Sequence, residues 1–269
     1  MALERNKLVC YATLPDGHGF ENTIAAAAAA GFEEVSLWLL SLDQGREELG
    51  SLDAVAACLA AHGMRASVLE LLLAWPGGEV GAAAGELAVM QAAAEVMQPE
   101  VILAACMDTS LAPGAVARLK SQCQALAPLK VALEFLPWSA LPSLESAWQM
   151  VEQVDEPNLG FVLDTWHFAW AGQDFDTLAR IPGDRIHFIQ VNDMRAEPLE
   201  DIVEETLCHR LRPGEGVVDW SRLLRLLAAA GVDCPLGTEQ FSDEVKAMSL
   251  PEASRYLYES VQALFGNHP

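Results

Sequence analysis

The stretch Leu159-Gly-Phe-Val-Leu-Asp164-Thr-Trp-His167 contains the pattern that decides the fold. An apolar run of strand length leads directly into polar residues, with Asp164 first and His167 three positions later. Apolar runs without alternation indicate strands that are buried on both faces, as in a parallel sheet. Polar residues at the carboxyl ends of such strands lie where the active sites of parallel barrels form. The stretch therefore predicts a parallel sheet whose strand ends carry a site.

The same pattern extends in both directions along the chain, because apolar runs alternate with Ala- and Leu-rich segments of helix length. The predicted strands cover residues 8–14, 34–39, 65–71, 101–106, 130–136, 159–163, 185–191 and 235–240. The predicted helices cover residues 22–30, 51–61, 79–97, 114–126, 143–154, 174–180, 219–230 and 249–264. This alternation is typical of βα units and a parallel sheet.

Eight such units in 269 residues agree with the roughly 250 residues of a closed barrel. We therefore predict the α/β class and a (β/α)₈ TIM barrel, in a single domain over residues 1–269. An open doubly wound sheet is the alternative. It usually has fewer strands and a glycine-rich first turn, and the segment 11–19 does not match that motif.

Composition and charge exclude several classes of protein. The chain is 52% hydrophobic with a mean hydropathy of +0.19, which excludes intrinsic disorder. Sixteen Lys and Arg against 38 Asp and Glu leave a net charge of −22, which repels nucleic acid and anionic membrane surfaces. The alanine run at 25–30 is too short to span a bilayer. We expect no nucleic-acid and no membrane partner.

Targeting and cysteine signals are those of a cytoplasmic protein. The first residues lack a basic segment followed by an apolar one, so we expect no signal peptide. The six cysteines are scattered without Cys-x-x-Cys spacing, and most stand in apolar stretches, as reduced thiols do.

Four polar side chains stand at the ends of four consecutive predicted strands: Glu134, Asp164, Gln190 and Glu239. Each is costly to bury unless it is paired or bound to a cation. A closed barrel brings them to one side of its mouth, where three carboxylates and an amide oxygen suit a hard divalent ion such as Mg²⁺ or Mn²⁺. Any one of them alone is more often a structural hydrogen-bonding group, and their equivalent positions favour the metal site.

The chain has only four lysines, Lys7, Lys120, Lys130 and Lys246, and none is predicted inside the mouth. A Schiff-base aldolase, which needs a lysine there, is therefore disfavoured. The same scarcity predicts that no positive side chain competes for the four polar groups.

Four further residues are candidates for substrate contacts. His167 is either a packed core histidine or a group that faces the site. Arg210, in His209-Arg210-Leu-Arg-Pro-Gly-Glu-Gly216, belongs either to a solvated turn or to a loop that points a guanidinium at substrate oxygens, and its place after a strand favours the second. Trp38 and Trp138 form either an apolar wall beside the substrate or ordinary packing.

In order and spacing these segments resemble the xylose isomerase-like barrel superfamily, in particular its sugar phosphate isomerase/epimerase group. The segments are Leu-Glu134-Phe, Leu-Asp164-Thr-Trp-His167, His187-Phe-Ile-Gln190-Val-Asn-Asp193, His209-Arg210-Leu-Arg-Pro-Gly-Glu-Gly216 and Gly-Thr-Glu239. The resemblance is specific in the second half of the chain and rests on pattern alone in the first. Gln190 replaces a histidine that is usual in ketose 3-epimerases, and is similar to the hydroxypyruvate isomerase and inosose dehydratase branches.

The resemblance implies one divalent metal ion, Mn²⁺ or Mg²⁺ first and Co²⁺ or Zn²⁺ as further candidates. Its implied ligands are Glu134, Asp164, Gln190 and Glu239. Glu134 and Glu239 would also be the catalytic acid and base, and His167, Arg210 and Trp38 would contact the substrate.

The implied function is a metal-dependent isomerase or epimerase of a keto-polyol or keto-sugar, acting by proton transfer through an enediolate. The alternative is a metal-dependent dehydratase of an inosose- or dehydroshikimate-type substrate. A third hypothesis is a non-catalytic barrel that binds a small metabolite. The sequence leaves the oligomeric state open, and a homodimer, the commonest soluble assembly, is one candidate.

Overall fold

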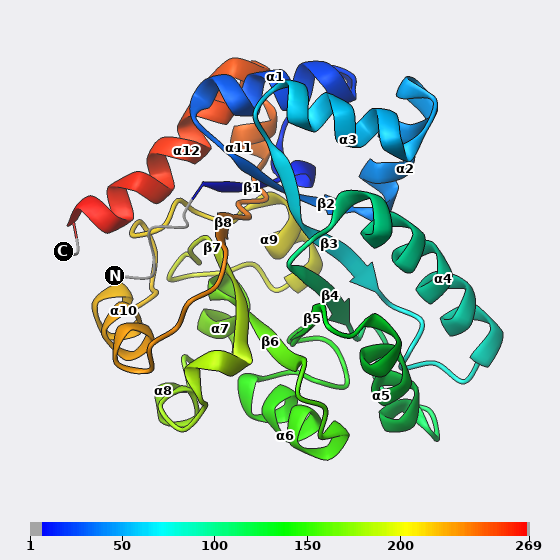
Figure 1. Ribbon diagram of the computed structural model, residues 1–269. Helices are drawn as coiled ribbons and strands as arrows, with labels where there is room; N and C mark the ends of the chain where they lie inside the picture. The colour runs from blue at the N-terminus through cyan, green and yellow to red at the C-terminus, as the bar shows by residue number, and fades with distance from the viewer. Residues whose placement is uncertain (1–6, 268–269) are drawn as a thin grey trace.

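The computed structural model describes residues 7–267, which form a closed barrel of eight parallel strands (Figure 1). Each strand pairs with its neighbours in the chain, and β8 closes the barrel against β1. The strands are β1 (Leu8–Cys10), β2 (Glu34–Trp38), β3 (Arg65–Leu72), β4 (Val101–Ala105), β5 (Lys130–Glu134), β6 (Leu159–Asp164), β7 (Ile186–Val191) and β8 (Leu236–Thr238). The predicted (β/α)₈ fold is confirmed.

Helices surround the barrel, and each predicted helix is present (Figure 1). These are α1 (Phe20–Ala30), α3 (Leu52–Ala61), α4 (Val80–Met97), α5 (Ala115–Leu126), α6 (Leu144–Val154), α8 (Phe175–Leu178), α10 (Trp220–Ala229) and α12 (Leu250–Asn267). Side chains that cap helix N-termini mark several of these starts, for example Ser51 before α3 and Asp219 before α10.

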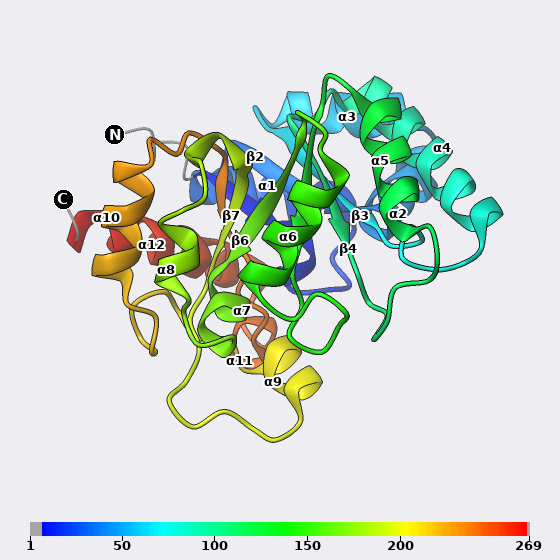
Figure 2. The ribbon, with the colours of Figure 1, turned by 90° about the horizontal axis from the view of Figure 1, so that it is seen from below.

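Four helices were not predicted: α2 (Leu39–Leu49), α7 (Thr165–Trp170), α9 (Ile202–Cys208) and α11 (Asp243–Lys246). Figure 2 shows α7, α9 and α11 together at one end of the barrel, where the chain before α9 projects furthest. In α2, Gly45 lowers helix propensity, yet a side chain there would collide with the ring of Phe20. The sequence signal for this helix is weak because close packing requires the glycine.

The first strand is shorter than predicted. It ends at Cys10, and a 3₁₀ turn over Tyr11–Thr13 follows, in which the Thr13 hydroxyl donates to the Cys10 carbonyl at 2.7 Å. This local hydrogen bond gives the backbone an alternative to the strand ladder.

Apolar side chains fill the interior of the barrel. Its interior core comprises Leu8, Val68, Val101, Leu103, Ala132, Val162 and Phe188. A larger core lies between the barrel and its helices. Because strand side chains alternate in direction, residues two positions beyond the interior core also face inward, one layer nearer the carboxyl ends. That next layer is where the polar residues lie.

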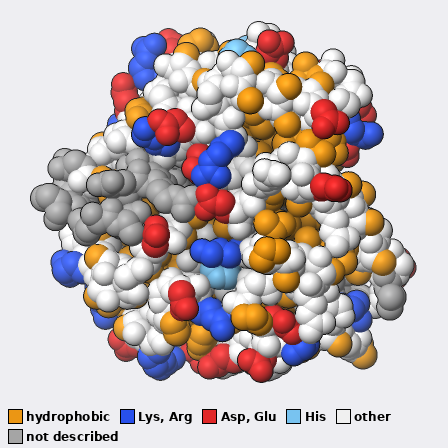
Figure 3. Space-filling view, in the orientation of Figure 1, with side chains coloured by type: hydrophobic (Ala, Val, Ile, Leu, Met, Phe, Trp, Pro, Cys, Tyr) orange, Lys and Arg blue, Asp and Glu red, His pale blue; other side chains and the backbone are white. Residues whose placement is uncertain are grey.

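Within residues 7–267, no helix is long and apolar enough to cross a membrane. On the face shown in Figure 3, basic side chains lie beside acidic ones, so charges of both signs are interleaved there.

Candidate active site

The predicted ligands form the last interior layer of the barrel. Glu134, Asp164 and Gln190 each lie two residues beyond an interior core side chain, which are respectively Ala132, Val162 and Phe188. The strand register places Asp164 level with Gln190. Glu239 directly follows β8, and all four side chains are buried. Their position is as predicted, and their role as metal ligands stays a prediction.

A positive side chain joins two of these groups. Arg210 Nη1 donates to Asp164 Oδ2 at 2.7 Å and to Glu239 Oε2 at 3.2 Å. The prediction that no cation competes for the carboxylates is therefore wrong. It considered the lysines, whereas the partner is an arginine 46 residues from Asp164 in the chain.

Arg210 is held on every side. Its Nε donates to the Thr206 carbonyl at 2.8 Å and its Nη2 to the Thr206 hydroxyl at 2.8 Å. The guanidinium also lies over the rings of Trp166 and Phe241, at 5.5 and 5.2 Å. Burial alone would lower its pKa, but the carboxylates of Asp164 and Glu239 outweigh burial and raise it. The guanidinium is a permanent charge in this site.

The two carboxyl partners of Arg210 end with different pKa values, although the arginine lowers both. Burial raises the pKa of Asp164, but the charge of Arg210 and further contacts outweigh it and leave a pKa of about 2. At Glu239, burial and the neighbouring Glu70 outweigh Arg210, so its pKa stands well above the usual range. Two buried carboxyls that share one arginine thus differ in their readiness to hold a proton.

His167 faces the site. Its Nε2 lies 3.4 Å from Glu134 Oε1 and 4.0 Å from Asp164 Oδ2, and its Nδ1 has no hydrogen-bond partner among the described residues. The rings of Trp138 and Trp166 meet it edge-on at 5.4 and 5.3 Å. Both readings of the sequence hold in part, because the ring is packed among aromatics and also contacts two predicted ligands.

The donor atoms fit a divalent cation. Single ligand atoms of Glu134, Asp164 and His167 lie within 4.8 Å of one another. The Gln190 amide donates through Nε2 to Glu239 Oε1 at 2.8 Å, which leaves its buried Oε1 without a partner in the described part of the chain. Carboxylate and amide oxygens with one imidazole are ligands that Mn²⁺, Mg²⁺ and Zn²⁺ accept.

Sequence reasoning missed two members of this layer, Glu70 on β3 and Cys10 on β1. Single ligand atoms of Cys10, Glu70 and Glu239 also lie within 4.8 Å of one another, and all three are buried. Burial and the nearby Glu134 raise the pKa of Glu70 well above its usual range. The signal was present, since Glu70 lies two residues beyond the interior side chain of Val68, as Glu134 lies two beyond Ala132.

The loop that carries Arg210 is fixed by a buried aspartate. Asp193 accepts hydrogen bonds from the backbone of Gly214 at 2.9 Å and Val218 at 3.0 Å, and from the Trp220 indole at 2.9 Å. A side chain at Gly216 would approach Asp193 to 2.4 Å, so this turn requires glycine. The Pro-Gly-x-Gly segment is thus a turn that is exposed at Gly214 and Gly216 and yet ordered by Asp193, and Arg210 itself is buried.

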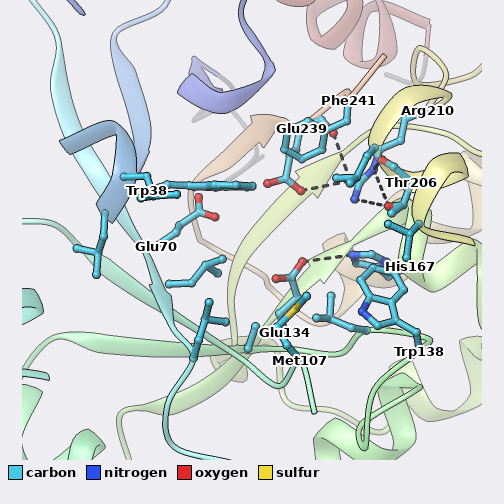
Figure 4. A pocket seen from close by; sticks show the side chains of 18 of the residues that line it. Trp38, Glu70, Met107, Glu134, Trp138, His167, Thr206, Arg210, Glu239 and Phe241 are labelled. Carbon is cyan, nitrogen blue, oxygen red and sulfur yellow. Dashed lines mark hydrogen bonds and ion pairs between the residues drawn. The ribbon is translucent and has the colours of Figure 1, made fainter. Parts of the chain in front are cut away.

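Glu134, Glu239 and their neighbours Glu70, His167 and Arg210 line a cavity of about 410 Å³ (Figure 4). Glu70, Glu134 and Glu239 point into it from three strands, with His167 and Arg210 on one side. Trp38 and Trp138 stand on opposite sides as apolar walls, and Trp38 lies 5.8 Å from the ring of Phe241. All the predicted substrate contacts therefore line one cavity.

The chain matches the xylose isomerase-like TIM barrel family over residues 24–262. It belongs to this family. Within xylose isomerase-like barrels, the 3-dehydroshikimate dehydratase of Pseudomonas putida is 32% identical over 120 residues, which are 44% of this chain and 19% of that protein. The inosose isomerase of Bacillus subtilis is 29% identical over 127 residues, 46% of this chain and 45% of that one.

The structure of the IOLI protein with a bound zinc atom superposes with a TM-score of 0.86 at 21% identity, over 97% of this chain and 98% of that one. At this identity the likeness shows the fold alone. The matched regions span less than half of both curated relatives, one of which is a dehydratase and the other an isomerase.

Proposed function

We propose that this barrel is a metal-dependent isomerase or epimerase that moves a proton next to the carbonyl of a small keto-polyol. One observation carries the proposal: Glu134 and Glu239 face a single cavity from β5 and β8, beside further groups that suit a divalent ion. Two carboxyls on different sides of one substrate are what the removal and return of a proton require.

Glu134, Asp164, Gln190 and Glu239 would hold the ion, with His167 as a further donor. The ion would supply positive charge to a substrate carbonyl and its adjacent hydroxyl, which acidifies the neighbouring C–H. Mn²⁺ and Mg²⁺ fit the oxygen donors best.

The protein's own groups divide the remaining work. One of Glu134 and Glu239 would take the proton from carbon, and the other would return it to the same or the adjacent carbon. Arg210 holds Asp164 and Glu239 in place, and His167 does the same for Glu134. Trp38 and Trp138 would exclude water from the two faces of the substrate.

The test is exchange of substrate hydrogen for deuterium, followed by NMR in D₂O over a panel of keto-sugars, inososes and dehydroshikimate. We expect Glu239→Gln to lower exchange by about 10²- to 10⁴-fold, the usual contribution of a positioned acid or base. Metal content is measured on every variant. Retained turnover with metal bound in Glu239→Gln would remove this residue from the acid–base role.

A dehydratase is the second candidate, favoured by the 32% identity to the Pseudomonas putida enzyme. It would use the same proton removal and then lose a hydroxyl as water, which mass spectrometry of the products detects. A non-catalytic barrel would show neither exchange nor any response to chelation.

A further inference from the structure

We propose that the substrate carries an uncharged apolar group, alkyl or aryl, on the side away from its reacting keto-alcohol end. The apolar mouth of the cavity would bind this group. The inference rests on the proposed function for the placement of the reacting end at the cavity floor.

Most of the large apolar side chains that are exposed in the described chain lie at this mouth. Six large hydrophobic residues are exposed within the described chain, and five line this cavity: Leu40, Leu73, Met107, Val203 and Leu207. They come from α2, from the segments after β3 and β4, and from α9. Exposed apolar groups from four separate segments that meet at one opening indicate a binding surface.

The mouth is poorly suited to a fully hydroxylated sugar. Hydroxyls placed against Leu40, Met107 or Leu207 would lose water without gaining a hydrogen-bond partner, which disfavours binding. An alkyl or aryl group would instead bury the same side chains. The cavity of about 410 Å³ lies within the range of small-molecule sites, with polar groups at one end and apolar walls elsewhere.

The charges of the cavity disfavour an anionic substituent. Four lining residues are glutamates (Glu70, Glu86, Glu134 and Glu239), and Arg210 is the one Lys or Arg among the described lining residues. Its Nη1 is already engaged by Asp164 and Glu239. A phosphate or carboxylate on the substrate would meet like charge without a free cation.

The experiment compares three probes on metal-loaded protein: hydroxymethyl hexyl ketone, the same ketone with a terminal carboxylate, and fructose. Binding is measured by calorimetry and by the intrinsic tryptophan fluorescence, to which Trp38 and Trp138 in the cavity contribute, and proton exchange is measured by NMR. Each buried methylene contributes about four-fold in affinity, which fructose cannot gain, and the terminal carboxylate would meet the glutamates of the lining. We therefore expect the hexyl ketone to bind at least about 10-fold tighter than the other two.

The variant Leu40→Ser/Met107→Ser tests whether the mouth causes this preference. Both positions are exposed, at 76% and 53%, so the fold is retained. We expect affinity for the hexyl ketone to fall about 10-fold with fructose unchanged. Val89→Ser is the matched control, because Val89 is 52% exposed on α4 away from the cavity, and it should change neither value.

Equal affinity for all three probes, or a preference that the double variant leaves intact, overturns the inference while the proposed function stands. A preference for the hexyl ketone that depends on the mouth, without proton exchange of any probe, supports the apolar site and overturns the proposed function. A dimer that the double variant converts to monomer with unchanged ligand affinity assigns the mouth to a subunit interface and overturns the inference.

Discussion

Two arginines at opposite ends of the barrel each lie between two carboxylates, and they differ in almost everything else. Arg65, at the start of β3, pairs with Glu34 and Glu100, and its side chain is 46% exposed. Arg210, at the carboxyl end, pairs with Asp164 and Glu239, and its side chain is 3% exposed. One arginine between two carboxylates is thus a solvated surface group at one end of the barrel and a buried network at the other.

The difference shows how a parallel barrel separates its two ends. Charges at the strand starts face water, where ion pairs contribute little and perturb few neighbours. Charges at the strand ends are buried, so each charged side chain alters the pKa of its neighbours. Some buried polar atoms there also have no hydrogen-bond partner among the described residues, such as Gln190 Oε1. The solvated end is suited to stability, and the buried end is suited to chemistry.

Removal of each arginine gives the largest expected contrast. Arg210→Met leaves Asp164 and Glu239 buried without their cation, and we expect it to lower the free energy of unfolding of metal-free protein by about 3–5 kcal/mol. Arg65→Met should lower it by no more than about 1 kcal/mol. Urea denaturation at pH 7 measures both. Equal losses of unfolding free energy in the two variants would show that burial does not make the Arg210 pairs more important for stability than the Arg65 pairs.

A buried histidine near the strand starts gives a test by pH. His187, near the start of β7, lies 3.0 Å from the Val131 carbonyl and 3.1 Å from the Asp184 carbonyl, and burial lowers its pKa from 6.5 to about 4. The unfolded chain therefore takes up a proton below pH 6.5 that the native state refuses until about pH 4. This contribution to stability is complete above pH 6.5 and is lost as pH falls towards 4, by about 3 kcal/mol in total.

The slope of stability against pH tests this assignment. His187→Gln should flatten the slope between pH 6.5 and 4, whatever its effect on stability at pH 7. His18→Gln, at an exposed position, is the control. A slope unchanged by His187→Gln would assign the acid sensitivity to other groups.

A metal ion should stabilise the protein by binding at the buried end of the barrel and not at the solvated end. At about 100 times its Kd, Mn²⁺ should raise the free energy of unfolding by about 2.7 kcal/mol, and EDTA should reverse the gain. Asp164→Asn should abolish the gain and Arg65→Met should keep it, as thermal denaturation with and without metal would show. A gain that survives Asp164→Asn would place the ion elsewhere.

Salt gives the smallest expected effect. The exposed Arg65 pairs should weaken by a few tenths of a kcal/mol between low salt and 0.5 M NaCl, since surface charges are screened and buried ones are not. A double-mutant cycle of Arg65→Met with Glu34→Gln measures the coupling at each salt concentration. Coupling that does not respond to salt would mean that this pair is not solvated.

Most of the barrel could be predicted because its signals are local. Apolar runs mark the strands, and Ser51 and Asp219 mark helix starts through bonds to residues three positions away. At the mouth, α7 and α9 also start at capping aspartates, Asp164 and Asp201, but with six and seven residues they are too short to show a helical period. Helix α2 carries Gly45 for packing, and α9 has only seven residues in a segment without clear periodicity.

The candidate site was predicted in part for the same reason. Glu134, Asp164 and Gln190 could be found because strand side chains alternate in direction, and each lies two residues beyond an apolar side chain of the barrel interior. Glu70 obeys that rule equally and could have been found by it. The pairing of Arg210 could not, because its partners lie 46 and 29 residues away and no local pattern encodes such contacts.

The amino-acid sequence by itself determined the order of strands and helices and the inward direction of the polar side chains, since both follow from periodicity along the chain. Only the tertiary structure decided which charges meet and what covers the cavity. Closure of the barrel brings Glu70 opposite the later strands, and the Asp193-anchored loop delivers Arg210 and α9 to the mouth. These are distances between residues remote in sequence, and folding alone sets them.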